Sequence, residues 1–227
     1  IEHLIKNGTD ALVVAGTTGE SPTLSFNEKV ALFEHTVKTV AGRIPVIAGT
    51  GSNNTSSSIE LTKKAESIGV DAVMLVAPYY NKPSQQGMYE HFKAIANATK
   101  LPVMLYNIPG RSVVNMSVEL VQQLAAIENI VAVKEASGNL DQITAIISAT
   151  PDDFLVYSGD DGFTLPVLAV GGNGVVSVAS HVVGNELKEM ITSFYSGNYQ
   201  HAAKCHQKLL PIVKALFMAP NPSPVKA

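Results

Sequence analysis

Short apolar runs recur along the whole chain, and polar residues follow most of them. Seven runs begin at Ala11, Pro45, Asp71, Leu101, Ile130, Phe154 and Gly174, at intervals of 20 to 34 residues. Most are nearly continuous in Val, Ile, Leu, Met and Ala, as strands are when both faces of their sheet are covered. The pattern therefore predicts seven strands in repeated β–α units, which form a parallel sheet.

The intervals between these runs carry apolar residues at helical spacing. The helices that we expect span residues 26–40, 55–68, 84–98, 117–127, 185–194 and 199–217. Ser117 is the predicted N-cap of the helix at 117–127. Gly69 is predicted to end the helix at 55–68. The chain opens on the helix-like segment IEHLIKN, with no strand pattern before it.

Alternating strands and helices form either a closed barrel or an open doubly wound sheet. No GxGxxG follows the first run, and polar residues gather after many runs rather than at one switch point. We therefore predict an α/β fold of the (β/α)8 TIM-barrel type. A barrel of this type places its active site at the carboxyl ends of the strands.

Composition narrows the possible functions. With 16 basic against 19 acidic residues, the chain lacks the excess of positive charge typical of nucleic-acid binders. No apolar run approaches the roughly 20 residues of a membrane helix. A single cysteine, Cys205, excludes an intrachain disulfide and favours a cytoplasmic location. The histidines form no HExxH, so we expect no catalytic metal.

Lys134 is the sharpest chemical feature, because it lies inside the apolar run IVAVKEAS. Burial lowers the pKa of an amine, and a neutral amine can attack a ketone to form a Schiff base. A lysine paired with a buried acid, or one that reaches out to water, is the structural alternative. Tyr106 holds a comparable strand-end position, where a phenol can shuttle protons or simply pack in the core.

Several other positions carry candidate binding groups. Thr17 and Thr18 follow the first strand and either form a plain turn or bind a carboxylate through hydroxyl and amide groups. Arg111 is either a solvated charge on a loop or binds a substrate carboxylate through the two parallel N–H groups of its guanidinium. Asp160 and Asp161, and the run GGNG at 171–174, are interpreted as tight turns in preference to a cation site and a phosphate site.

Taken together, several motifs resemble one known family. They are GTTGE at 16–20, PYYN at 78–81, YNIPGR at 106–111 and VKEAS at 133–137, with SGDD and GGNGVVSVAS after them. In this order they resemble the dihydrodipicolinate synthase (4-hydroxy-tetrahydrodipicolinate synthase) family of the N-acetylneuraminate lyase superfamily. Arg111 after YNIP and the Thr17-Thr18 pair favour the synthases over the lyases.

The resemblance implies condensation of pyruvate with L-aspartate 4-semialdehyde, the first committed step of lysine and diaminopimelate synthesis. Lys134 would form the Schiff base, and Tyr106 would donate and accept protons. Thr17 would link Tyr106 to Tyr80, which would reach into a neighbouring subunit of a homotetramer, a dimer of dimers. The implied substrate-binding residues are Thr18, Arg111, Gly159 and Val176. No metal or organic cofactor is implied, nor any nucleic-acid or membrane partner.

Two alternatives remain open, a 2-keto-3-deoxy-sugar-acid aldolase and a non-catalytic barrel. Phe26, Lys29 and Ser57 stand where lysine-inhibited members of the family carry histidine and glutamate, so we expect weak lysine feedback. The family also has a strand before this chain's first one and a helical segment at its end. We therefore expect a barrel domain at 1–217, the start of that segment at 218–227, and a longer biological chain.

Overall fold

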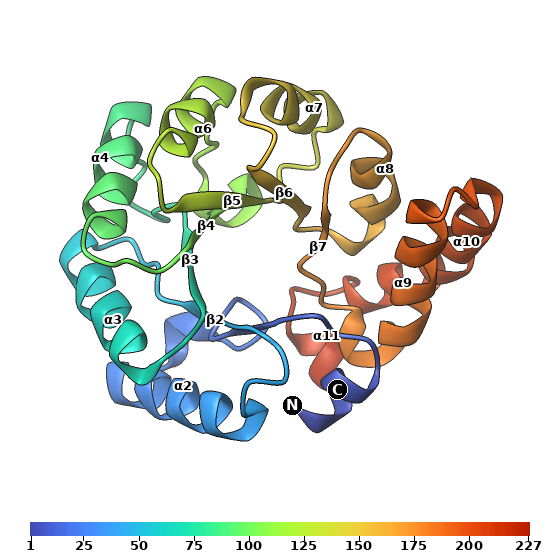
Figure 1. Ribbon diagram of the computed structural model, residues 1–227, viewed down its shortest axis with the longest axis horizontal. Helices are drawn as coiled ribbons and strands as arrows, with labels where there is room; N and C mark the ends of the chain where they lie inside the picture. The colour runs from blue at the N-terminus through green and yellow to red at the C-terminus, as the bar shows by residue number, and fades with distance from the viewer.

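The fold is a curled, seven-stranded parallel sheet surrounded by helices, described by a computed structural model of all 227 residues. Its strands pair in chain order. They are β1 (Leu12–Val14), β2 (Val46–Gly49), β3 (Ala72–Val76), β4 (Val103–Asn107), β5 (Ile130–Glu135), β6 (Leu155–Ser158) and β7 (Gly174–Val175). The predicted barrel type is confirmed as a partial barrel, because β1 and β7 do not pair with each other (Figure 1).

The long helices form a ring outside the strands (Figure 1). They are α2 (Phe26–Val40), α3 (Thr55–Ile68), α4 (Gln85–Ala96), α6 (Val118–Ala125), α7 (Leu140–Ala149), α8 (Thr164–Ala169), α9 (Ser180–Tyr195) and α10 (Tyr199–Leu216). Short helical turns are α1 (Glu2–Lys6), η1 (Ser21–Thr23), α5 (Pro109–Ser112), η2 (Asp161–Phe163) and α11 (Ser223–Lys226). None of the helices is both long and apolar enough to cross a membrane.

The predicted helix ends are confirmed at two caps. The Ser117 side chain accepts a hydrogen bond from the Leu120 amide at 3.2 Å, and Gly69 ends α3 with φ of 90°. The pattern misses α7, although Asn139 caps it by accepting from the Gln142 amide. Its sequence, LDQITAIISA, is apolar on most sides, so its helical spacing is hard to see.

The start of α9 also differs from the sequence prediction, by five residues. The helix begins at Ser180 and is interrupted at Val183, whose φ of −128° is not helical. Gly184 follows, and a side chain there would come within 2.5 Å of the Asn7 carbonyl oxygen. The interruption at Val183 turns residues 180–182 relative to the rest of α9. These residues therefore do not continue the helical spacing of the later turns, and the sequence pattern misses them.

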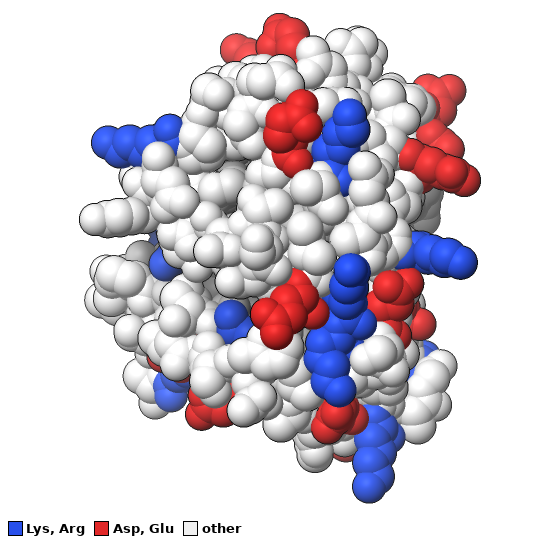
Figure 2. Space-filling model, turned by 90° about the vertical axis from the view of Figure 1, so that its left-hand side faces the viewer, with Lys and Arg blue, Asp and Glu red and all other residues white.

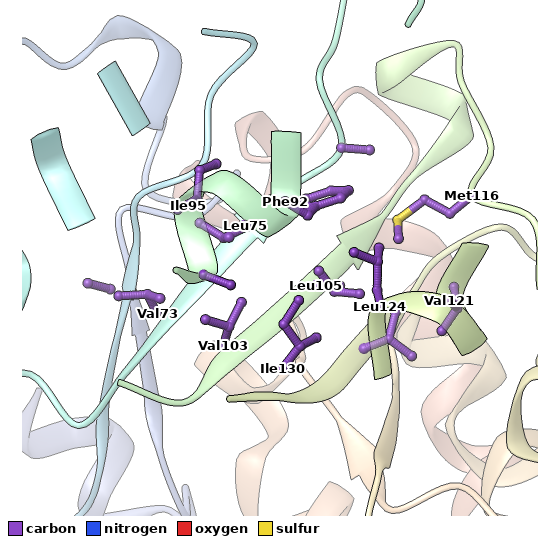
Figure 3. Close-up of a cluster of buried hydrophobic side chains, with 14 of the residues drawn as sticks. Val73, Leu75, Phe92, Ile95, Val103, Leu105, Met116, Val121, Leu124 and Ile130 are labelled. Atoms are coloured by element: carbon purple, nitrogen blue, oxygen red, sulfur yellow. The ribbon is translucent and has the colours of Figure 1, made fainter. Parts of the chain in front are cut away.

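The main core lies between the sheet and the helix ring. Alternate residues of β3, β4 and β5 face outward onto α4 and α6, and Figure 3 shows Leu75 and Leu105 near Phe92 of α4. The residues between them face inward, where Met74, Met104 and Tyr106 form a smaller cluster. The period-two alternation of a strand thus separates a packed outer layer from an inner surface that carries the site.

The N-terminal residues pack against α9 on the open side of the barrel. His3 and Asn7 hydrogen-bond to His181 and Asn185, and Lys188 forms an ion pair with Asp10 at 2.6 Å. Both chain ends lie on this side of the ring (Figure 1). Across the face of α2 to α4, acidic and basic side chains are interspersed without a large patch of one sign (Figure 2).

His91 of α4 gives a prediction about acid stability. It is 6% exposed, its Nδ1 lies 2.8 Å from the Thr55 hydroxyl, and its Nε2 has no partner. Burial lowers the pKa of His91 to about 4, whereas an unfolded histidine has a pKa of about 6.5. Because the unfolded chain takes up this proton first, the free energy of unfolding falls as the pH drops from 6.5 towards 4.

We expect this fall to be on the order of 3 kcal/mol, since the folded and unfolded pKa values differ by about 2.5 units and one unit corresponds to about 1.4 kcal/mol. Urea unfolding of the wild type and of His91→Asn between pH 7.5 and 4 measures it. The variant retains an amide next to Thr55 and removes the titration, so its acid dependence should be shallower. Exposed His35→Asn is the matched control, and parallel curves for wild type and His91→Asn would contradict the prediction.

Candidate active site

A cavity of about 710 Å³ extends from the carboxyl ends of the strands along the inner face of the sheet to the open side, where the N-terminal segment packs against α9. An adjoining cavity of about 450 Å³ shares several of its walls, including Thr17, Tyr106 and Arg111. Seven of the eight residues singled out from the sequence line the larger cavity, namely Thr17, Thr18, Tyr106, Arg111, Lys134, Gly159 and Val176. Tyr80 lines only the adjoining one.

Lys134 extends from β5 into this cavity and is 8% exposed. Its Nζ lies 4.1 Å from the centre of the Tyr106 ring, and it has no carboxylate partner. Burial lowers the pKa of Lys134 to about 8, although the charge of Asp161 acts in the opposite direction. The amine is therefore partly neutral near physiological pH and free to act as a nucleophile.

Tyr106 reaches the same space from β4, directly beside Lys134 in the sheet register. It is 3% exposed, and burial raises the pKa of its phenol, while the Thr17 hydroxyl and the Arg111 charge lower it. The phenol thus stays protonated at neutral pH. A protonated phenol next to an amine is placed to give a proton to a nearby oxygen and to take it back.

Two glycines keep room for these side chains and turns. A side chain at Gly159, after β6, would come within 2.6 Å of the Ala136 Cβ and 3.2 Å of the Lys134 Cε. One at Gly49 would meet the Ala15 carbonyl oxygen at 2.4 Å. Ala15, with φ of 56°, begins the tight turn that carries Thr17 and Thr18. Because β2 passes close to this turn, only glycine fits at position 49.

Arg111 lies on the short helix α5 and has no carboxylate partner. One of its guanidinium nitrogens donates to the Asn221 carbonyl oxygen at 2.8 Å. The Asn221 side chain in turn donates to the Thr18 hydroxyl at 3.1 Å. A guanidinium held in this way at a cavity wall is suited to binding an anionic group.

Asn221 was not among the candidates, because its proline-rich surroundings carry no periodic signal. It lies 110 residues from Arg111 and 203 from Thr18 in the sequence, yet contacts both. The same C-terminal segment pairs Lys226 with Glu20 at the cavity wall. Asn221 itself is 8% exposed, although asparagine is mostly an exposed residue type, and nothing in its local sequence indicates this burial.

Asp161 begins the predicted turn and also fixes one wall of the cavity. Its buried carboxylate accepts hydrogen bonds from Ser177 and from the amides of Val178 and Ala179, at 3.0 and 3.2 Å for the amides. Burial raises the pKa of this carboxyl, and those hydrogen bonds lower it. Asp161 thereby fixes the segment after β7, which includes the wall residue Val176.

Tyr80 stands apart from the buried groups. It is 88% exposed and has φ of 72°. Its loop is held by a pair of hydrogen bonds, from Asn53 to the Asn81 side chain at 3.0 Å and from Asn81 to the Asn53 carbonyl at 2.9 Å. The loop thus presents an aromatic side chain outward on a fixed backbone.

One cluster of metal-ligating side chains lies outside the cavity. Glu189, His201 and Cys205, on α9 and α10, place their ligand atoms within 4.8 Å of one another. Glu189 and His201 are exposed and already hydrogen-bond to each other at 2.6 Å. The cavity itself holds no comparable group of ligands.

Fold and cavity together define a β/α-barrel protein with a desolvated amine and a phenol at the strand ends. The whole chain, residues 1–227, matches the model of the dihydrodipicolinate synthetase family, and the chain belongs to that family. It is 70% identical over 226 residues to the 4-hydroxy-tetrahydrodipicolinate synthase of Bacillus velezensis and 68% identical over 227 residues to that of Bacillus subtilis. These alignments cover 100% of this chain and 78% of each relative.

Solved structures agree with this assignment. The dihydrodipicolinate synthase DapA-2 of Bacillus anthracis superposes with a TM-score of 0.97 at 65% identity, and the match covers 99% of this chain and 77% of that one. At this identity the similarity extends beyond the fold to most side chains.

Proposed function

We propose that this chain condenses pyruvate with L-aspartate 4-semialdehyde to 4-hydroxy-tetrahydrodipicolinate, in the pathway to diaminopimelate and lysine. It is a lyase, as its relatives at 68% and 70% identity are. The observation that carries the proposal is the desolvated Lys134 amine, 4.1 Å from the Tyr106 ring in the strand-end cavity. That arrangement suits Schiff-base chemistry on a small keto acid.

In the proposed reaction, the neutral Lys134 amine first attacks the carbonyl carbon of pyruvate. Tyr106 gives a proton to the departing oxygen, and water leaves as the imine forms. Loss of a methyl proton gives the enamine, whose carbon attacks the aldehyde of the second substrate. The amine of that substrate then adds to the imine carbon, releases Lys134 and closes the ring.

The remaining roles concern binding and proton relay. Thr18 would hold the pyruvate carboxylate, and Arg111 would bind the carboxylate of the aldehyde substrate. Gly159 and Val176 would line the site through backbone groups, and Thr17 would pass a proton between Tyr106 and Tyr80. Support for these roles is that all but Tyr80 line the larger cavity, and that the Arg111 guanidinium has no carboxylate partner.

We also propose that Tyr80 completes the site of a neighbouring copy in a homotetramer built as a dimer of dimers. Support comes from its exposed side chain on a loop braced by Asn53 and Asn81. A phenol that no group of its own chain covers is suited to insertion into another chain. We place this assembly in the cytoplasm, where a single cysteine stays reduced.

Borohydride reduction in the presence of pyruvate tests the Schiff base. We expect a covalent adduct on Lys134, located by peptide mass spectrometry, and we expect turnover with L-aspartate 4-semialdehyde in a coupled assay. Absence of the adduct would indicate a non-catalytic barrel. An adduct with turnover only on 2-keto-3-deoxy sugar acids would indicate an aldolase, which the Arg111 side chain disfavours because it presents a charge suited to a second carboxylate.

The rate of adduct formation should depend on pH through Lys134. Because burial lowers its pKa to about 8, the reactive neutral amine increases about tenfold per pH unit well below 8 and then reaches a plateau. Stopped-flow trapping at saturating borohydride between pH 6 and 10 measures this profile. An ordinary exposed lysine, with a pKa of about 10.4, would still gain rate at pH 10, and such a profile would contradict the prediction.

A further inference from the structure

Directly behind the Lys134–Tyr106 pair lies a second pair of polar residues on the other face of the same strands. The register of β4 and β5 sets Tyr106 beside Lys134 and Asn107 beside Glu135. Because successive residues of a strand face opposite sides, the inner pair, Tyr106 and Lys134, lines the cavity. The outer pair, Asn107 and Glu135, faces the helix layer and is absent from both cavity walls.

The outer pair is fully enclosed and extensively hydrogen-bonded. Asn107 is 0% and Glu135 is 1% exposed. Asn107 donates to the Glu135 carboxylate at 2.9 Å, the Ser137 amide donates to it at 2.6 Å, and Gln142 of α7 donates at 3.3 Å. The Asn107 side-chain oxygen accepts from the Met116 amide at 3.0 Å.

No basic side chain neutralises Glu135. Burial raises the pKa of this carboxyl, and its amide partners lower it. A carboxylate enclosed in this way is costly unless every lone pair is used. An apolar residue, such as those that fill the outer layer elsewhere, would cost less here. The buried carboxylate of Glu135 is therefore expected to have a role other than packing.

An irregularity at the start of the same strand pair indicates that role. Val103 pairs with Ile130, but Met104 pairs with Ala132, so Val131 is skipped. The bulge shifts the pairing of these two strands by one residue, and a further slip of one residue would turn every following side chain to the opposite face. After such a slip, Lys134 would face the helices instead of the cavity.

We propose that Asn107 and Glu135 are positioning residues that lock the register of β4 on β5 and so hold the Lys134 amine against Tyr106. Their hydrogen bond forms only in the register that brings the inner pair together. The surrounding donors from Ser137 and Gln142 fix the carboxylate on the helix side. The inference rests on the function proposed above, because its readout is the reaction of Lys134 with pyruvate.

The test is Glu135→Gln, which keeps the shape of the side chain and turns one acceptor into a donor facing the donors of Asn107 and Gln142. We expect trapping at Lys134 to slow on the order of 10²-fold, the scale of a misplaced reacting group, while the pyruvate KM changes little. Exposed Glu60→Gln is the matched control. Circular dichroism and thermal melting report the folded fraction of each variant.

The swapped variant Asn107→Asp/Glu135→Gln restores a donor opposite an acceptor between positions 107 and 135. It does not restore the contacts with Gln142 and Asn115, so it should recover part of the rate. A folded Glu135→Gln that traps pyruvate at the wild-type rate overturns the proposal. So does a rate that falls only with the folded fraction and is not recovered in the swapped variant. If Glu135→Gln does not fold, Gln142→Ala removes a single donor; a several-fold slower trapping supports the proposal, and an unchanged rate overturns it. A wild type that forms no adduct rejects the proposed function itself.

Discussion

Lys134→Ala is expected to abolish both the borohydride-trapped adduct and turnover, with a loss in kcat of at least about 10⁴-fold, the scale on which removal of a covalent nucleophile acts. The reason is that no other amine lines the depth of the cavity beside Tyr106. Lys188 and Lys226 line it at the wall, but each is bound to an acid, Asp10 and Glu20 respectively. Neither can replace a desolvated amine.

The same variant should fold as well as the wild type. Lys134 has no carboxylate partner, and its lowered pKa means that the folded chain disfavours its charged form. Removal of the ammonium therefore relieves a desolvation cost, as is common when a residue serves catalysis at the expense of stability. Thermal melting checks this point, and exposed Lys63→Ala is the control for activity. Residual adduct on another lysine would show that the nucleophile is misassigned.

Tyr106→Phe should lower turnover by about 10²- to 10⁴-fold, the usual contribution of a general acid–base. The ring that packs 4.1 Å from the Lys134 amine is kept, and only the hydroxyl is lost. Each proton transfer in imine formation then relies on water, which lacks the fixed position of the Tyr106 hydroxyl. Nuclear magnetic resonance can follow the exchange of pyruvate methyl protons with deuterium oxide, which should slow together with turnover.

Tyr157→Phe is the matched control, because Tyr157 of β6 lines the same cavity and its phenol also has a raised pKa from burial. It pairs with Lys134 in the sheet register, on the side opposite Tyr106. We expect it to retain nearly full activity. Equal losses in Tyr106→Phe and Tyr157→Phe would argue that polarity of the cavity, and not a specific proton transfer, supports the reaction.

Much of the fold is predictable because its signals are local. The spacing of apolar runs predicts the seven strands, and capping residues such as Ser117 and Gly69 predict helix ends. The failures are also local in origin. The helix α7 is apolar on most sides, and α9 is interrupted at Val183 beside a close approach of the N-terminal segment.

The chemical character of the site is likewise present in the sequence. A lysine inside an apolar run loses hydration wherever the strand packs, and a tyrosine near the end of the preceding strand is expected at the same edge of a parallel sheet. These inferences need only the period of a strand and the cost of burying a charge.

Only the tertiary structure decides which groups meet. Asn221 contacts Thr18 and Arg111 across 203 and 110 residues, and nothing in its local sequence indicates either partner. The register of β4 on β5, with one residue skipped, likewise decides that Tyr106 and not a neighbour lies beside Lys134. The sequence by itself determined the elements and the buried amine, because periodicity and burial act along a strand. The contacts around that amine depend on how distant segments pack, and packing is a property of the whole chain.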